Sequence, residues 1–212
     1  MKDGTIYWLA PDLAVRREQK VAGRVLGLAL DSFGGYLAIS TNNATVELSD
    51  CTGRSCFRVS TPRPLHHLAF LAEAPFVIGC ADYGLVLCLD LKGNVVWRDG
   101  PVSHIGSLAV NGDGTEIVLA CFTDGLRRYD GQGKPRASFS IAETCRLATM
   151  AYDGSIILVA GLGQRLLLLD SAGRVKQRKE LDDAPRALAI GPLGDYAVVA
   201  QSGGPILCIE TT

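Results

Sequence analysis

The sequence predicts an all-β fold made of repeated four-stranded antiparallel units, and three observations lead to this prediction. Apolar runs are short, β-branched and bounded by Gly, Asp or Pro, and no window has helical periodicity. An aliphatic position recurs every 40 residues, and a Leu-Ala dipeptide recurs in parallel with it. The turn motif Asp-x-x-Gly follows four of the aliphatic positions.

The 40-residue period holds without slippage along the chain. The aliphatic position is occupied by Ile6, Val46, Val86, Leu126, Leu166 and Ile206. We expect each Asp-x-x-Gly motif to form a hairpin turn, in which the carboxylate caps the backbone and Gly supplies a positive φ that a Cβ disfavours. The four motifs are Asp50–Gly53, Asp90–Gly93, Asp130–Gly133 and Asp170–Gly173.

Each repeat is predicted to contain four strands, A to D. Strand A carries the Leu-Ala dipeptide, strand B follows a short turn, strand C ends at the recurring Asp, and strand D is more polar. The five dipeptides begin at Leu28, Leu68, Leu108, Leu147 and Leu188. Because one such unit has two apolar faces, it is stable only when neighbouring units cover them, as in the blades of a β-propeller.

The strand order predicts a single β-propeller domain over residues 1–212. Residues 1–24 supply strands C and D of a split blade, and residues 185–212 supply strands A to C. The complete blades are expected at 25–64, 65–104, 105–144 and 145–184. Strand C is present once more than a five-blade ring needs. We favour five blades with exchange between the N- and C-terminal strands; a segment of a longer propeller, or closure and self-association between chains through the terminal strands, are alternatives.

Composition and charge exclude several classes of function. The formal charge is −1, from 21 basic and 22 acidic residues, so there is no net field to attract nucleic acid. No apolar run has the length needed to insert into a membrane. Seven cysteines leave at least one thiol unpaired, which indicates a reducing cytoplasm. We expect Cys80, Cys88, Cys121 and Cys208 to fill the core, and leave open whether Cys51 pairs with Cys56.

All three histidines fall in the connection between strand D and the next strand A. They are His66, His67 and His104, and the same connections carry Arg24, Arg63, Arg146 and Arg186. One face of the ring is therefore expected to gather donors for a protein or acidic peptide partner, although loop residues are also polar simply because loops are solvated. Adjacent His66 and His67 point to opposite faces of an extended strand, so we expect no metal site.

Two segments resemble known propeller repeats. Residues 113–130, which contain Asp124-Gly125 and end at Tyr129-Asp130, resemble the second half of a WD-type repeat. Residues 81–97, ending at Trp97, resemble a blade of the quinoprotein-like (PQQ-like) propellers. The resemblance implies a β-propeller. The Trp that quinoprotein-like blades use for docking occurs in one predicted blade only, as Trp97. The chain is also less than half as long as an eight-bladed quinoprotein enzyme. We therefore expect no quinone or other cofactor.

The sequence favours a non-enzymatic scaffold that binds a protein partner through loops on one face. The inner strands carry Leu-Ala rather than an acid–base cluster, so no catalytic residue is expected. The alternatives are a small-ligand or hydrolase-type propeller with a site at the channel mouth, and a structural module of a larger protein or assembly.

Overall fold

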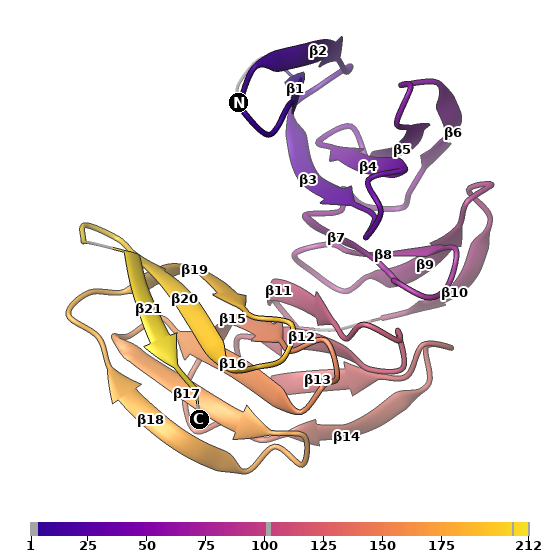
Figure 1. Ribbon diagram of the computed structural model, residues 1–212. Coiled ribbons are helices and arrows are strands. Elements are labelled where there is room, and N and C mark those ends of the chain that lie inside the picture. The colour runs from indigo at the N-terminus through magenta and orange to yellow at the C-terminus, as the bar shows by residue number, and fades with distance from the viewer. Residues whose placement is uncertain (1–3, 101–102, 205, 212) are drawn as a thin grey trace.

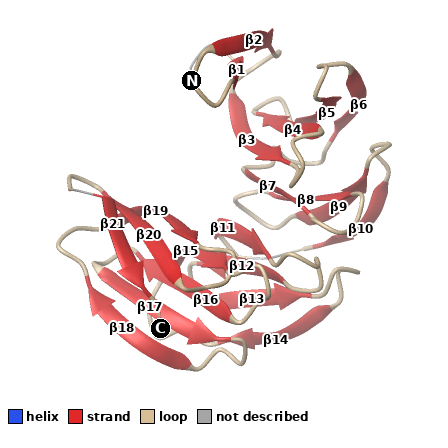
Figure 2. Ribbon diagram, in the orientation of Figure 1, coloured by secondary structure: helices blue, strands red, loops and turns tan. Residues whose placement is uncertain are grey.

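Strands are the regular secondary structure of this protein. The computed structural model describes residues 4–100, 103–204 and 206–211, and over these residues it contains the strands β1 to β21 (Figure 2). No helix in the described part of the chain is long and apolar enough to span a bilayer. The predicted all-β class is confirmed.

Four complete four-stranded antiparallel sheets follow one another along the chain. Sheet 1 contains β3 (Val25–Leu30), β4 (Tyr36–Thr41), β5 (Thr45–Asp50) and β6 (Ser55–Ser60). Sheet 2 contains β7 (His67–Phe70), β8 (Phe76–Cys80), β9 (Val86–Asp90) and β10 (Val95–Asp99). Sheet 3 contains β11 (Ile105–Val110), β12 (Ile117–Cys121), β13 (Gly125–Tyr129) and β14 (Pro135–Phe139). Sheet 4 contains β15 (Cys145–Met150), β16 (Ile156–Gly161), β17 (Arg165–Asp170) and β18 (Val175–Glu180).

Two smaller sheets flank these four. The N-terminal hairpin pairs β1 (Thr5–Leu9) with β2 (Val15–Lys20). The C-terminal sheet has the order β19 (Pro185–Ile190), β20 (Tyr196–Gln201), β21 (Ile206–Glu210). By the period, the hairpin supplies strands C and D of a repeat, and the C-terminal sheet supplies strands A, B and C.

The sheets are arranged along an open arc. Strands β3, β7, β11, β15 and β19 contact one another in that order on the inner side, while β6, β10, β14 and β18 lie on the outer side (Figure 1). The hairpin is at one end of the arc and the C-terminal sheet is at the other. The four-stranded sheets are blade-like, and the structure does not join the two ends of the arc.

The core lies between successive sheets rather than inside any one of them. Ile78 and Cys80 of sheet 2, for example, form one apolar cluster with Ile117 and Leu119 of sheet 3. The same arrangement recurs at each junction along the arc. Burial of this apolar surface is the main favourable term in folding, so each sheet depends on its neighbours.

The cysteine predictions are confirmed at three positions and wrong at one. Cys80, Cys88 and Cys121 are buried, and this burial raises the pKa of each thiol. Cys208 is exposed, because the face of β21 that carries it has no neighbouring sheet. Cys51 is also exposed, and all seven cysteines are free thiols.

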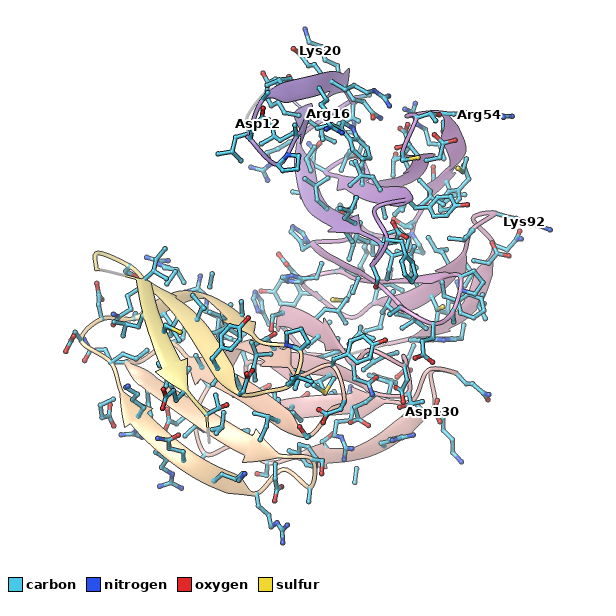
Figure 3. All side chains as sticks on the ribbon, in the orientation of Figure 1. Asp12, Arg16, Lys20, Arg54, Lys92 and Asp130 are labelled. Carbon is cyan, nitrogen blue, oxygen red and sulfur yellow. The ribbon has the colours of Figure 1, made fainter. Side chains whose placement is uncertain are left out.

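The Asp-x-x-Gly turns have the predicted chemistry. The Asp90 carboxylate accepts hydrogen bonds from the backbone amides of Lys92 and Asn94, both at 2.8 Å, and Gly93 has a φ of 85°. The other three turns repeat this pattern. The turns lie on the outer side of the arc, as the labelled Arg54, Lys92 and Asp130 show (Figure 3).

The turn glycines also receive side chains from the preceding sheet. A Cβ at Gly93 would lie 3.0 Å from the Phe57 ring, and a Cβ at Gly133 or Gly173 would overlap the ring of Trp97 or Phe139. Trp97 also donates a hydrogen bond from Nε1 to the Gly131 carbonyl at 3.2 Å. Each turn is therefore the docking point for strand D of the sheet before it.

The Gly173→Ala variant tests this docking. Residue 173 has a φ of 78°, and its Cβ would overlap Phe139, so we expect a loss of about 1–3 kcal/mol in the free energy of unfolding. Chemical denaturation measures the loss. The control is Gly34→Ala, where φ is 69° and no atom lies within 4 Å of the added Cβ. Equal effects of the two variants would contradict the docking role.

The turn carboxylates predict a loss of stability in acid. Hydrogen bonds from the Asn94 side chain, and from the Asn94 and Lys92 amides, lower the pKa of Asp90 below its ordinary 3.8. Because the folded state holds the carboxylate ionised, the free energy of unfolding should fall as the pH falls from about 5 through that value. Asp90→Asn should flatten this dependence in urea unfolding at pH 3 to 6. Superimposable profiles for the two proteins would refute it.

Candidate interaction face

One edge of every sheet carries both the D-to-A connections and the B-to-C turns. In sheet 2, His67 is opposite Cys80, Cys80 is opposite Val86, and Val86 is opposite Asp99. The start of strand A, the end of B, the start of C and the end of D therefore share this edge, which we call the loop edge. The histidines predicted as site residues all lie on it.

The three histidines converge where sheets 2 and 3 meet. His66 Nδ1 lies 3.2 Å from the Asp82 carboxylate. His104 packs edge-on against two aromatic rings, with centroid distances of 4.8 Å to Tyr83 and 4.2 Å to Phe122. His67 lies near enough to Asp82 and to the other two imidazoles for their charges to influence its titration. These six residues, His66, His67, Asp82, Tyr83, His104 and Phe122, are called the imidazole cluster below.

Backbone hydrogen bonds hold the cluster in place. The amide of Ile105 donates to the Asp82 carbonyl at 2.9 Å, which ties the B-to-C turn of sheet 2 to the connection entering sheet 3. The amide of Phe122 donates to the His104 carbonyl at 3.0 Å. The backbone that carries the cluster is thus supported by two sheets.

Burial disfavours the protonated form of His67. Desolvation lowers the pKa of this imidazole below 6.5, and the charges of His66 and His104 act in the same direction. The Asp82 carboxylate and a hydrogen bond with the Ile105 backbone oppose the shift.

A hollow of about 410 Å³ lies on the loop edge of sheet 2. Arg63 from the connection entering sheet 2 and Arg98 from β10 line it together with Asp99. The Asp99 carboxylate accepts hydrogen bonds from the Tyr129 hydroxyl and the Gly100 amide, each at 2.8 Å. Gly84 and Leu85, which directly follow Tyr83 of the cluster in the chain, form another wall. The same B-to-C turn thus contributes to the hollow and to the cluster.

The other predicted arginines are distributed over separate sheets. Arg24 is exposed ahead of β3, and its amide donates to Asn42 Oδ1 at 2.7 Å. Arg146 is half-buried in β15. Arg186 is exposed in β19, where its Nε donates to Ser202 Oγ at 2.6 Å. The structure thus brings the three histidines together and leaves these arginines apart along the loop edge.

The sequence prediction missed three members of the cluster. Asp82, Tyr83 and Phe122 were not among the predicted site residues. The available signal was the aromatic residue at the B-to-C end of two successive repeats, next to connections that contain histidine.

The chemistry available at the loop edge is recognition by hydrogen bonds and ring contacts. Within the described ranges, no group of three or more His, Cys, Asp or Glu side chains is arranged to hold a metal ion. No model of a known protein family matches the sequence, and no curated protein is significantly similar to it.

The neutral state of His67 has a measurable consequence. The pKa of His67 is about 6.5 in the unfolded chain and lower in the folded state. The unfolded state therefore binds more protons, and the free energy of unfolding should decrease as the pH falls below about 6.5. The slope due to this residue is at most about 1.4 kcal/mol per pH unit. His67→Gln should have a flatter profile than wild type in urea unfolding from pH 7.5 to 5.5. An unchanged slope would show that His67 titrates normally in the fold.

Proposed function

We propose that this protein is a non-enzymatic β-propeller scaffold that binds a protein partner through an acidic peptide segment laid along the loop edge. The binding residues are Arg24, Arg63, His66, His67, His104, Arg146 and Arg186. The observation that carries the proposal is the imidazole cluster, in which three histidines and two aromatic rings converge on a rigid support.

The hollow beside the cluster favours an acidic ligand. Arg63 and Arg98 both line it, and a guanidinium group binds a carboxylate through two parallel hydrogen bonds. The edges of Tyr83 and His104 offer apolar contact next to these charges. A peptide with an acidic residue beside an aromatic or aliphatic residue would satisfy both parts of this surface.

Closure of the arc would complete the binding face. We infer a ring of five blades, joined by exchange between the terminal strands, in which Arg146 and Arg186 lie around the same opening as the cluster. The repeated four-stranded sheets and the resemblance to WD-type and quinoprotein-like repeats support this architecture. Connections on one face of a rigid scaffold are common positions for binding residues.

Charge reversal on the loop edge tests the proposed binding. Wild-type protein is titrated into a fluorescent pool of acidic peptides containing Tyr, and anisotropy reports the affinity. Arg146→Glu/Arg186→Glu and Arg63→Glu/Arg98→Glu should each weaken binding about tenfold or more, because carboxylates would face carboxylates.

The control changes the net charge equally, on another surface. Lys176→Glu/Arg178→Glu alters two exposed side chains of β18 on the outer side of the arc. It should leave the affinity within about twofold of wild type, because separated surface charges are screened by salt. If the loop-edge variants and this control bind the peptides alike, the partner face lies elsewhere.

A further inference from the structure

Sheet 1 has an exposed apolar surface. The equivalent surfaces of sheets 2, 3 and 4 are covered. Leu28 and Leu30 of β3 are 49% and 56% exposed. The residues at the same positions of the period in β7, β11 and β15 are at most half-exposed, because strand A of the preceding sheet lies over them. The N-terminal hairpin packs on sheet 1 but supplies only strands C and D, so Leu28 and Leu30 lack a covering strand A.

The C-terminal sheet has the complementary surface. Ala189 of β19 is exposed and Tyr196 of β20 is 45% exposed. The matching residues of sheet 1, Ala29 and Tyr36, pack in one cluster with Leu68 and Phe70 of sheet 2. Leu68 and Phe70 are the period equivalents of Leu28 and Leu30. Ala189 and Tyr196 are therefore the residues that would cover Leu28 and Leu30.

Strands β1 and β21 are each covered on one face, and the faces are opposite. In β1, Ile6 and Trp8 pack on sheet 1, whereas Tyr7 and Leu9 are 44% and 51% exposed. In β21 the alternation is reversed. Ile209 packs on sheet 4, whereas Ile206 is 72% exposed and Cys208 is exposed.

We propose that β1 takes the place of β21 at the edge of β20 within one chain, so that β19, β20, β1 and β2 form the fifth blade. The β4–β5 pairing gives the register, because Tyr36 is opposite Asp50 and Ala38 is opposite Leu48. Shifted by the period, Tyr196 is opposite Ala10 and Val198 is opposite Trp8. The structure instead pairs these β20 residues with Glu210 and Cys208 of β21. The inference rests on the proposed five-blade ring and is independent of the proposed peptide binding.

The pairing of β1 with β2 decides which of the two strands leaves. Release of β21 exposes Ile209 and the half-buried Leu207, and release of β1 would expose Ile6 and the half-buried Trp8. Release of β1 would also break its pairing with β2, whereas β21 has no strand beyond it in its sheet. With β1 in place, Tyr7 and Leu9 cover the face of sheet 4 that Ile209 had covered.

The hairpin supplies the outer strand of the new blade without losing its contact with sheet 1. Strand β2 stays paired with β1. Arg17 of β2 donates a hydrogen bond to the Gly53 carbonyl at 3.2 Å. Arg17 has the same position in the period as Phe57, which docks on the turn of sheet 2 at Gly93. The hairpin therefore already occupies the outer half of a blade that precedes sheet 1.

Three cysteine pairs distinguish the arrangements in full-length protein carrying Cys51→Ser and Cys56→Ser. Ala10→Cys/Tyr196→Cys, with Cys208→Ser, reports β1 beside β20. Val198→Cys with native Cys208 reports β21 beside β20. Arg17→Cys with native Cys208 reports β2 beside β21, as Phe57 is opposite Leu48 in sheet 1. A short oxidant pulse is followed by peptide mapping and non-reducing electrophoresis.

The proposal expects the 10–196 disulfide in the monomer as the highest-yield link. A dominant 17–208 link would show a closed ring with the other strand released, which overturns the strand assignment and leaves the ring. A dominant 198–208 link without 10–196 would overturn the ring itself. A 10–196 link confined to dimers would overturn closure within one chain.

Two further full-length variants do not depend on cysteine chemistry. In the proposed ring Leu9 is buried and Ile209 is released, so Leu9→Asp should lower the Tm by about 5 °C or more, or prevent folding. Ile209→Asp should leave the Tm within about 1 °C of wild type. A Tm lowered by Ile209→Asp, or left unchanged by Leu9→Asp, would overturn the proposal.

Discussion

The structure depends on the fact that a four-stranded sheet of this composition has two apolar faces and can cover neither by itself. Strand B of sheets 2 to 4 is buried along almost its whole length, on both sides of the sheet. Its burial comes from the sheets before and after it in the arc. Where a neighbouring sheet is missing, apolar side chains are exposed, as Leu30 of sheet 1 and Ile206 of the C-terminal sheet show.

The local features of the fold follow from sequence because the period fixes them. The Asp-x-x-Gly motifs mark the turns, and the hydrogen bonds of Asp90 and the positive φ of Gly93 are those that the residue types require. The strand boundaries follow from the turns. Cys208 is an exception. It occupies a position of the period that is buried in the other repeats, and it is exposed because no sheet packs on that face of β21.

The candidate site could be predicted only in part for a related reason. The period places the histidines in equivalent connections, so their arrival at one edge is readable from sequence. Asp82, Tyr83 and Phe122 come from the other kind of loop on that edge. Asp82 meets His66 within sheet 2, and Phe122 meets His104 within sheet 3, whereas Tyr83 meets His104 across the junction of the two sheets. The period does not specify how the two sheets pack at that junction.

The contact of Gly93, Gly133 and Gly173 with a ring of the preceding sheet limits how such a chain can change in length. Phe57 docks at Gly93, and Phe139 docks at Gly173, although Phe139 is two positions further from its own turn than Phe57 is. The aromatic residue can therefore differ by two positions within strand D and still contact the turn glycine of the next sheet. Deletion of half a repeat would instead place the aromatic ring next to a strand, where no turn glycine is present. Whole periods are the steps by which a lineage of this architecture can grow or shrink while every remaining interface keeps its fit.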